Sequence, residues 1–509
     1  MYLGMHPFNK GGKIMQYNSV VDFYNDDFNK TFYPLDTSRV LINNFSEQIN
    51  TYVKEKVLSS TDENSAFLPQ TRVYIPKYDL NLRRTVKLDP IAEFFIYNVI
   101  FENRLKFNNF EEGNRVTFGY KFFDNKFASS NSAYKAFKAK INELNNTYRF
   151  YIKFDISNYF NSLYHHDICN AFSNITSSND ERSAFGQFLR QINSGRSVDC
   201  LPQGIYPCKI IGSNFLQYID RSIQVKAESL VRFMDDFYLF SDSLDILKQD
   251  YLTIQKLLGE KGLSVNPIKT KWGEKINKSV DNEIDEIKLS LLKIRRAEIE
   301  VSGWVEEQEY IEELSLDNNQ ISYLLDMLKN KNKEIEEEDA ELVLSLMRHH
   351  SEKVLEFIPI FMEKFPNLIK NIFFFIKEDV DKEQLSNIII DFLEKVKYIS
   401  AYQLFWITKI IEEHLLEFRN CKKMLFDIYD HKESSIIVKA KILEIPDNSF
   451  GLADLREEHL KSGRSDWLSW SSAIGVRFDE KSHRNYMLKY FAKGSSINHL
   501  ISECICKFG

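Results

Sequence analysis

The spacing of apolar residues divides the chain into two parts with different predicted structures. Up to about residue 275 strand and helix signals are mixed. RFYIKFDIS (149–157) alternates as a half-buried strand does, and LVRFMDDFYLFSD (230–242) predicts two short strands that turn at an Asp pair. Helical stretches such as HHDICNAFSNI lie between them. This mixture predicts an α+β fold.

After about residue 290 the strand signals nearly stop. Segments such as YQLFWITKIIEEHLLEFRN place apolar residues three and four positions apart, which is typical of helices. Pro, Asn, Asp or Gly separates these segments, although no sharp period is visible. We therefore expect stacked helix pairs, an all-α helical-repeat (HEAT-like) domain at 286–509. It would follow an N-terminal segment at 1–70 and an α+β domain at 71–285.

Composition favours a globular protein in a reducing compartment. The 509 residues are 43% apolar and 14% aromatic, which is enough to build several cores. Six Cys with no CxxC pair argue against a disulfide framework or a zinc site. The sequence has neither a run of about 18 apolar residues nor a signal-peptide core. We expect a cytoplasmic protein that does not contact a membrane.

Charge is distributed unevenly along the chain. Residues 1–275 carry 34 basic and 30 acidic side chains, whereas residues 276–509 carry 32 basic and 43 acidic ones. The first part is therefore better suited to an anionic substrate. The acidic second part is hard to reconcile with a cradle for a long nucleic-acid duplex, because phosphate neutralisation dominates that affinity.

Three aspartates lie at the ends of predicted strands. Asp235 and Asp236 form the turn of FMDD, and Asp155 ends the earlier strand YIKFD. An Asp pair alone is most often a solvated turn, but a second strand-end carboxylate weakens that interpretation. Mg²⁺ prefers one or two carboxylates plus substrate phosphates, and a two-metal site needs a further carboxylate from elsewhere. The pattern indicates a site for two Mg²⁺ ions, with Mn²⁺ as an alternative.

Other motifs surround these aspartates in a recognisable order. IPKYDLNLRR (75–84) comes first, FDISNYFNSLYHH contains Asp155, LPQG (201–204) precedes FMDD, and GLSVNPIKTKW (262–272) comes last. This order resembles the palm and fingers of reverse transcriptases over roughly residues 70–275. The resemblance implies metal ligation by Asp155 and Asp235 with Asp236 assisting. It also implies a ligand from the Ile156 carbonyl and a proton from Lys269 for the leaving pyrophosphate.

The same resemblance implies a nucleotide-binding site. The basic residues expected to hold the triphosphate are Lys77, Arg83 and Arg84, where Arg can bind in bidentate fashion. Gln203 and Gly204 would pack under the incoming nucleotide, because Gly permits close approach of the backbone. Phe160 matches the steric-gate position that excludes a ribose 2′-hydroxyl, which would make the substrate a dNTP. A plain core aromatic is the alternative for Phe160.

Three further stretches narrow the resemblance. LRRTVKLDPIAEFFIYNVI (82–100), DNKFASSNSAYKAFK (124–138) and FDISNYFNSLYHHDI (154–168) look like the abortive-infection reverse-transcriptase-like proteins of bacteria, the AbiK, AbiA and prophage Abi group. So does a palm followed by helical repeats. That family implies antiphage defence by template-independent DNA synthesis, with the product single strand covalently attached to the protein. It also implies a ring-like homo-oligomer, a trimer or a hexamer.

Protein priming requires a hydroxyl of this chain that can enter the active site. A phenol is a plausible nucleophile once metal lowers its pKa from about 10. Tyr33 lies in TFYPLDTSR, among turn formers, so we expect it to be exposed and favour it as the primer, followed by Tyr24. Both could instead be packing tyrosines. Trp467 and Trp470 are candidate stacking platforms for the emerging strand, or else core tryptophans.

Two other functions remain open. A template-dependent reverse transcriptase of retron or group II intron type would need added RNA template and primer. A non-catalytic helical-repeat interaction protein would have no need of Asp155, Asp235 and Asp236 together. The role in phage defence rests wholly on the family resemblance.

Overall fold

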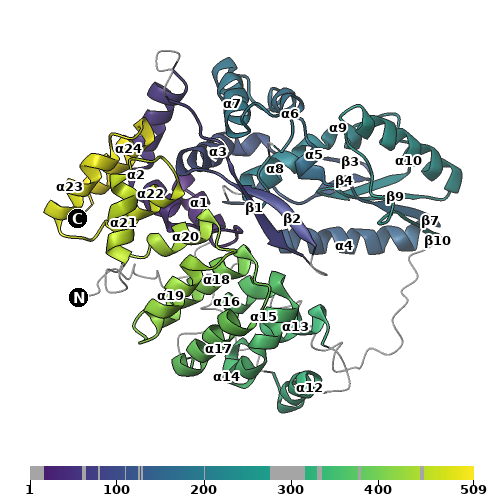
Figure 1. Ribbon diagram of the computed structural model, residues 1–509. Coiled ribbons are helices and arrows are strands. Elements are labelled where there is room, and N and C mark those ends of the chain that lie inside the picture. The colour runs from purple at the N-terminus through teal and green to yellow at the C-terminus, as the bar shows by residue number, and fades with distance from the viewer. Residues whose placement is uncertain are drawn as a thin grey trace.

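The computed structural model describes residues 17–59, 65–77, 81–108, 110–123, 126–127, 130–199, 201–274, 316–329, 335–376, 380–446 and 452–508. A sheet-containing region lies at one side of the molecule, and helices occupy the rest (Figure 1). The boundary expected between residues 285 and 286 lies outside the described residues.

A six-stranded sheet carries the expected α+β region. Its strands run in the order β10-β7-β9-β8-β4-β3. All neighbouring pairs are antiparallel except β4 with β8. The strands are β3 (Glu111–Glu112), β4 (Arg115–Phe118), β7 (Phe150–Phe154), β8 (Ser229–Phe233), β9 (Asp236–Ser241) and β10 (Lys271–Glu274). The strands predicted within 149–157 and 230–242 are thereby confirmed.

Helices cover both faces of this sheet. Successive residues of a strand point to opposite faces, and β9 shows it: Tyr238 and Phe240 pack with Phe137 of α4 (Ser130–Thr147). Phe237 and Leu239 instead join the main core. That core includes α8 (Tyr206–Phe215) and α10 (Leu244–Gly259), with α5 (Tyr159–Ser162), α6 (His165–Phe172), α7 (Asn179–Ile192) and α9 (Gln217–Asp220) nearby.

A two-stranded hairpin and a buried helix connect this region to the N-terminus. The hairpin pairs β1 (Thr71–Pro76) with β2 (Leu82–Lys87). The helix α3 (Pro90–Glu102) follows it, capped by the Asp89 carboxylate, which accepts the N–H groups of Ile91 and Ala92 at 2.9 and 3.0 Å. Almost every side chain of α3 is buried, so this helix lies in the centre of the core.

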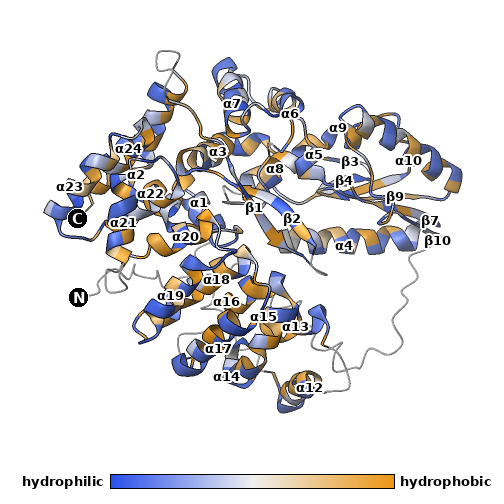
Figure 2. Cartoon of the chain, viewed as in Figure 1, coloured by the Kyte–Doolittle hydropathy of each residue, from blue (hydrophilic) through white to orange (hydrophobic). Residues whose placement is uncertain are grey.

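The part of the chain described between 316 and 508 is helical and contains no strand, as expected. One row of packed neighbours runs α13, α16, α18, α20, α22, α24, and a second set includes α17 with α19 and α21 with α23. Helices α18, α20 and α22 are buried on nearly all sides. Figure 2 shows hydrophilic residues alternating with hydrophobic ones on α17, α19, α21 and α23. The HEAT-like character stays a prediction.

The bounds of these helices are α12 (Asn318–Lys329), α13 (Glu337–Leu346), α14 (Ser351–Val354), α15 (Ile358–Lys364), α16 (Ile369–Phe375), α17 (Lys382–Lys395), α18 (Ala401–Ile410), α19 (Cys421–Asp430), α20 (Ile436–Leu443), α21 (Leu452–Lys461), α22 (Trp467–Gly475), α23 (Lys481–Phe491) and α24 (Ser496–Cys506). Among the described residues, no helix is long and apolar enough to cross a membrane.

The N-terminal helices join the two regions. Helix α1 (Val20–Phe28) packs on α3, and α2 (Asp36–Tyr52) packs on α3, α22 and α24. The buried carboxylate of Glu444 accepts the backbone N–H groups of Asp36 and Thr37 at 2.9 and 2.7 Å, at the start of α2. The helical region therefore provides the cap that α2 needs for its first N–H groups.

Candidate active site

The aspartate pair lies at a two-residue turn between β8 and β9. Phe233 pairs with Asp236, which leaves Met234 and Asp235 as the residues of the turn. Met234 has a φ of 54°, a conformation that costs a non-glycine residue energy but that tight hairpins require at this position. The turn therefore presents adjacent carboxylates at one end of the central strands.

Asp155 reaches the same end of the sheet from the neighbouring strand. It follows β7, which pairs with β9, and its side chain is almost completely buried. Its Oδ2 accepts a hydrogen bond from Lys269 Nζ at 2.6 Å, while its buried Oδ1 has no partner. A buried carboxylate oxygen without a partner is costly, so this atom is suited to a ligand.

Ile156 lies beside the chain segment that carries Lys269. It forms an antiparallel bridge with Val265. The flanking bonds run from Asn266 N–H to the Asp155 carbonyl and from Ser157 N–H to the Ser264 carbonyl, each at 2.8 Å. They use the backbone groups of the neighbours of Ile156 rather than its own, which is compatible with the expected metal-ligand role of its carbonyl.

Burial raises the pKa of both aspartates of the FMDD motif. Burial raises the pKa of Asp235 to about 6, and the charges of Asp236 and Asp155 add to this effect. Burial also raises the pKa of Asp236, which Lys153 partly offsets. The hydrogen bond to Asp155 raises the pKa of Lys269. The site therefore holds more negative charge than it stabilises by itself, a condition that a bound cation relieves.

The oxygen atoms of the site suit divalent ions, although the carboxylates do not converge on one point in this conformation. Within the residues that the structure describes, no group of three or more His, Cys, Asp or Glu is close enough to hold a metal. In this conformation the Lys269 ammonium occupies one oxygen of Asp155. The unpartnered Asp155 oxygen and the all-oxygen donor set fit Mg²⁺ or Mn²⁺. We therefore regard these residues as compatible with the expected metals.

Lys77, just after the first strand of the hairpin, lies within electrostatic reach of Asp155 and Asp235. Burial lowers the pKa of Lys77, and the charges of Arg83 and Lys269 lower it further, while Asp235 and Asp155 oppose them. The pairing of Ile75 with Arg83 places Arg83 and Lys77 on the same face of the hairpin. The structure thus brings Lys77 and Arg83 together with Lys269 near the aspartates.

Arg84 lies elsewhere, because neighbouring strand residues point to opposite faces. Its guanidinium is 2.7 Å from Asp199 Oδ1. Asn161 Nδ2 donates to the same oxygen at 3.0 Å, and Arg72 lies 3.8 Å from the other. The expectation that Arg84 joins Lys77 and Arg83 is not met in this conformation, because its charge is already paired.

The turn of LPQG is covered by the N-terminal segment. Gly204 has a φ of 100°, and a Cβ there would lie 2.3 Å from Cδ2 of Phe32. Thr85 of β2 donates to the Gln203 carbonyl at 2.9 Å, and the Arg83 guanidinium carbon lies 5.6 Å from the Phe32 ring centroid. The sequence reasoning missed Phe32, and nothing in the motif TFYPL signals it.

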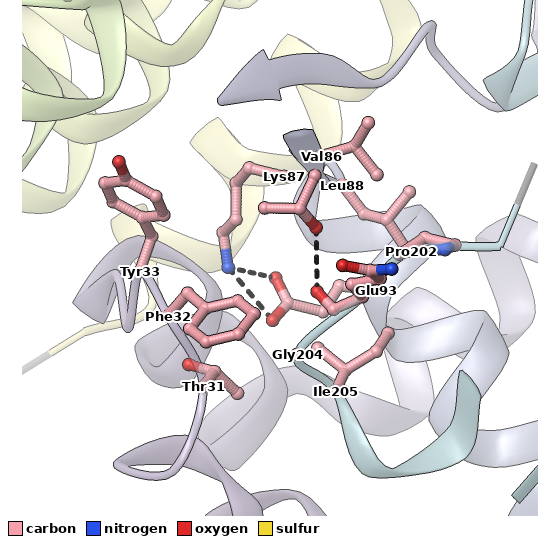
Figure 3. A pocket seen from close by; sticks show the side chains of 12 residues that line it. Thr31, Phe32, Tyr33, Val86, Lys87, Leu88, Glu93, Pro202, Gly204 and Ile205 are labelled. Atoms are coloured by element: carbon pink, nitrogen blue, oxygen red, sulfur yellow. Dashed lines mark hydrogen bonds and ion pairs between the residues drawn. The ribbon is translucent and has the colours of Figure 1, made fainter. Parts of the chain in front are cut away.

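A small cavity lies between these residues. Figure 3 shows the Phe32 ring directed at the Gly204 turn and the Tyr33 ring directed away from it. The cavity encloses about 20 Å³, room for about one water molecule rather than a nucleotide. The glycine turn is therefore closed by this chain's own side chains.

The comparisons with known proteins agree with the arrangement of carboxylates and motifs. Residues 87–323 match the family model described as reverse transcriptase (RNA-dependent DNA polymerase). This segment is a reverse-transcriptase domain. The domain supports a nucleic-acid polymerase, a nucleotidyltransferase of reverse-transcriptase type.

Solved structures add a weak likeness. Telomerase from Candida albicans, in complex with a TWJ fragment of telomeric RNA, is similar over 76% of this chain and 70% of that chain, with 14% identity and a TM-score of 0.33. Apo telomerase from Candida tropicalis is similar over 76% of this chain and 73% of that chain, with 14% identity and a TM-score of 0.33. Likenesses at this TM-score carry no argument. The sequence has no significant match among curated proteins.

Phe160 lies on helix α5 of the reverse-transcriptase domain. Its half-buried ring packs on α8, where a Cβ at Gly212 would lie 3.2 Å from Phe160 Cζ. The adjacent Tyr159 donates its hydroxyl to the Gly212 carbonyl at 2.6 Å. These contacts fix the ring against α8, and its role as a steric gate stays a prediction.

The expectation that Tyr33 is exposed is wrong. Only 3% of it is exposed, because its ring packs edge-on against Tyr402 and Phe405 and its hydroxyl donates to the Tyr74 carbonyl at 3.0 Å. Tyr24 is fully buried. Burial raises the pKa of both phenols. Neither can act as a primer in this conformation without leaving its packing.

The tryptophans are core residues rather than stacking platforms. Trp467 and Trp470 are each 3% exposed, and their rings pack edge-on. Trp470 Nε1 donates to Asn498 Oδ1 at 3.1 Å. Buried rings cannot stack on a base, so the interpretation of these residues as a contact for single-stranded DNA is wrong.

Proposed function

We propose that this chain is a template-independent, protein-primed DNA polymerase of abortive infection, which adds dNTPs to a hydroxyl of its own chain. The observation that carries the catalytic part is the unpartnered buried oxygen of Asp155 beside the Asp235–Asp236 turn, with Lys269 and Lys77 close by. Two divalent metal ions would complement the acidic groups, and a nucleotide triphosphate would complement the lysines. The bacterial cytoplasm, antiphage defence and a trimeric or hexameric assembly belong to the same proposal and rest on the resemblance.

Each residue would have a separate task. Asp155 and Asp235 would hold two Mg²⁺, with Asp236 and the Ile156 carbonyl as further donors. When bound, these ions would lower the pKa of the attacking hydroxyl and offset the charge of the leaving pyrophosphate. Lys269 would give its proton to that pyrophosphate after the metals displace it from Asp155, and its hydrogen bond to Asp155 keeps its Nζ protonated until then.

The remaining residues would bind the nucleotide. Lys77 and Arg83 share a face of the hairpin and would hold the triphosphate. Gln203 and Gly204 would support the nucleotide once Phe32 moves, and the Phe160 ring would select against a 2′-hydroxyl. Arg84 would take part only if its pair with Asp199 opens.

Priming from the chain itself is supported by the position of the N-terminal segment. Residues 31–33 line the same cavity as Gln203 and Gly204. This segment therefore lies next to the proposed nucleotide site, although the Tyr33 hydroxyl is held at the Tyr74 carbonyl. Tyr33 would have to leave Tyr402 and Phe405 to act, and Tyr24 would have to leave a fully buried position.

The test uses purified protein, Mg²⁺ and labelled dNTPs without template or primer. We expect label that migrates with the denatured protein, is released by protease and is absent from the Asp235→Asn variant. Tyr33→Phe and Tyr24→Phe form a matched pair, and loss of label from only one identifies the primer. Label that stays free of protein would contradict priming by this chain.

A template-copying reverse transcriptase is the second candidate, favoured by the printed description of the matched family as an RNA-dependent DNA polymerase. Extension that occurs only after an RNA template and DNA primer are added would establish it and exclude the first proposal. The third candidate is the non-catalytic interaction protein. It would be supported if neither assay incorporates labelled nucleotide and if Asp235→Asn plus Asp236→Asn leaves the biological activity unchanged.

A further inference from the structure

The side chain of Arg232 is fully buried, and Arg232 lies two residues before Met234, the first residue of the aspartate turn. It lies on β8, and both it and its ion-pair partner Asp220 have no exposed side-chain surface. Arg232 Nε lies 3.0 Å from Asp220 Oδ1, and Nη2 lies 2.5 Å from Oδ2. Thr117 donates to the same carboxylate at 3.1 Å. This side chain therefore has its charge balanced within the sheet.

The guanidinium of Arg232 also donates hydrogen bonds to two backbone carbonyls. Nη1 donates to the Met234 carbonyl at 2.8 Å, and Nη2 donates to the Ser213 carbonyl of α8 at 3.1 Å. The planar fork of Arg can make such bonds in several directions at once, which a Lys ammonium on a flexible stem cannot do in the same way. Arg232 thus connects Asp220, α8 and the turn that carries Asp235.

The Met234 carbonyl is the group that most needs such a partner. Met234 has a φ of 54°, in the left-handed region where a non-glycine residue pays a conformational cost. Its carbonyl belongs to the peptide that continues into Asp235, so its direction sets where the Asp235 side chain begins. A hydrogen bond at this carbonyl stabilises the strained turn against alternatives.

We propose that Arg232 is a positioning residue for the metal site, which holds the Met234–Asp235 peptide so that Asp235 faces Asp155. The inference rests on the proposed metal-dependent polymerase function. Asp235 and Asp155 carry like charges at the same end of neighbouring strands, so they repel each other when no cation is bound. A turn held only by its own strained backbone would yield to that repulsion, and Arg232 opposes this without touching metal or nucleotide.

If Arg232 served only to stabilise the fold, its substitution would lower stability without changing metal binding specifically. Replacing a buried ion pair by apolar residues of similar size is often neutral for stability, so the pair itself is no proof of a structural need. Asp220 alone accounts for the charge of Arg232, whereas the bond to the Met234 carbonyl serves only the turn. The two roles can therefore be separated by substitution.

The test measures Mn²⁺ binding to the whole protein by electron paramagnetic resonance, with thermal unfolding recorded in parallel. Arg232→Lys keeps the charge opposite Asp220, and the double variant Arg232→Met with Asp220→Leu replaces the pair by apolar groups. We expect either variant to bind Mn²⁺ at least about tenfold more weakly, while the midpoint of unfolding moves by only a few degrees in at least one of them. The nucleotide KM at saturating Mn²⁺ should stay unchanged.

Arg115→Lys is the matched control. Arg115 lies on the adjacent β4, and its guanidinium also donates to carbonyls, those of Asp220, Ser222 and Val225, but not to the turn. Its variant should bind Mn²⁺ as the wild type does. Unchanged Mn²⁺ affinity in the folded Arg232 variants overturns the positioning role, as does an equal loss in Arg115→Lys. If Asp235→Asn also binds Mn²⁺ like the wild type, the metal site itself is overturned.

Discussion

Lys269 Nζ lies 2.6 Å from Asp155 Oδ2, in an ion pair between a half-exposed loop lysine and an almost buried carboxylate. The pair occupies one of the two oxygens that this carboxylate can offer to metals and leaves the other without a partner. Metal binding at this site therefore competes with Lys269 for Asp155. The same movement would free the ammonium of Lys269 to face a leaving group.

Lys269→Met separates these two effects. Removing the ammonium leaves Asp155 free, so we expect Mn²⁺ affinity to stay the same or increase. The rate of nucleotide addition should fall by about 10²-fold or more, because general-acid assistance is lost. Mn²⁺ titration and single-turnover kinetics would check both. Weaker Mn²⁺ binding in Lys269→Met would show that this lysine supports the site rather than competing for it.

Gly204→Ala tests the contact with Phe32. The new Cβ would lie 2.3 Å from the Phe32 ring, on a backbone with a φ of 100°. We expect a destabilisation of roughly 1–3 kcal/mol from backbone strain together with the clash. Adding Phe32→Ala to Gly204→Ala should recover only the part of the lost stability that is due to the clash. Urea unfolding of the two single variants and the double variant would measure this part. Additive effects would mean that the two residues do not touch.

The sheet and its aspartates were predictable because their signals are local. A strand shows in the alternation of side chains, as in YIKFD before Asp155, and a turn shows in the polar pair between two apolar runs. The turn residues are Met234 and Asp235 rather than the expected Asp235 and Asp236, because Asp236 already pairs with Phe233 as the first residue of β9. The order of the motifs predicts that Asp155, Asp235 and Lys269 lie together. These three residues do lie near one another in the structure.

The details that could not be predicted depend on contacts between distant parts of the chain. Tyr33 stands among turn formers, yet residues of α18 cover it. Arg84 has the composition of a phosphate ligand, but Asp199 from a distant loop neutralises it. No local pattern reports which far segment will pack on a residue. The same limit hid Phe32, whose importance comes from lying on Gly204.

Lys441→Met should destabilise the joint between the N-terminal and helical regions. Lys441 is fully buried and lies 2.8 Å from Asp36, 2.7 Å from Glu412 and 2.7 Å from Glu444. Its removal leaves several buried carboxylates with too little positive charge, so we expect a loss of about 3–5 kcal/mol in the free energy of unfolding. Urea unfolding would measure the loss.

Lys423→Met is the control for that experiment. Lys423 also pairs with one carboxylate, Glu394, at 2.7 Å, but both side chains are more than half exposed. Solvent screens an exposed pair, so Lys423→Met should leave the free energy of unfolding nearly unchanged. Equal effects of the two substitutions would mean that Lys441 is not buried among its acidic neighbours as the structure has it.

Lys370 makes stability depend on pH in a defined direction. Burial lowers its pKa to about 7, and the charges of Lys209 and Lys30 lower it while Asp27 raises it. Its Nζ donates to the Thr31 carbonyl at 3.0 Å and lies 5.4 Å from the Trp406 ring centroid. Between pH 7 and the value of about 10.4 for a free lysine, the unfolded chain therefore binds a proton that the folded chain does not.

The free energy of unfolding should accordingly rise with pH in this window, with a contribution from Lys370 of up to about 1 kcal/mol per pH unit. Lys370→Met removes the titrating group and keeps a similar length of side chain, so its stability should rise less steeply. Urea unfolding of both proteins from pH 7.5 to 9 would compare the slopes. That range stays below the pH at which free tyrosines ionise. Equal slopes would mean that Lys370 keeps its proton in the folded protein, held by the Thr31 carbonyl and the Trp406 ring despite its burial.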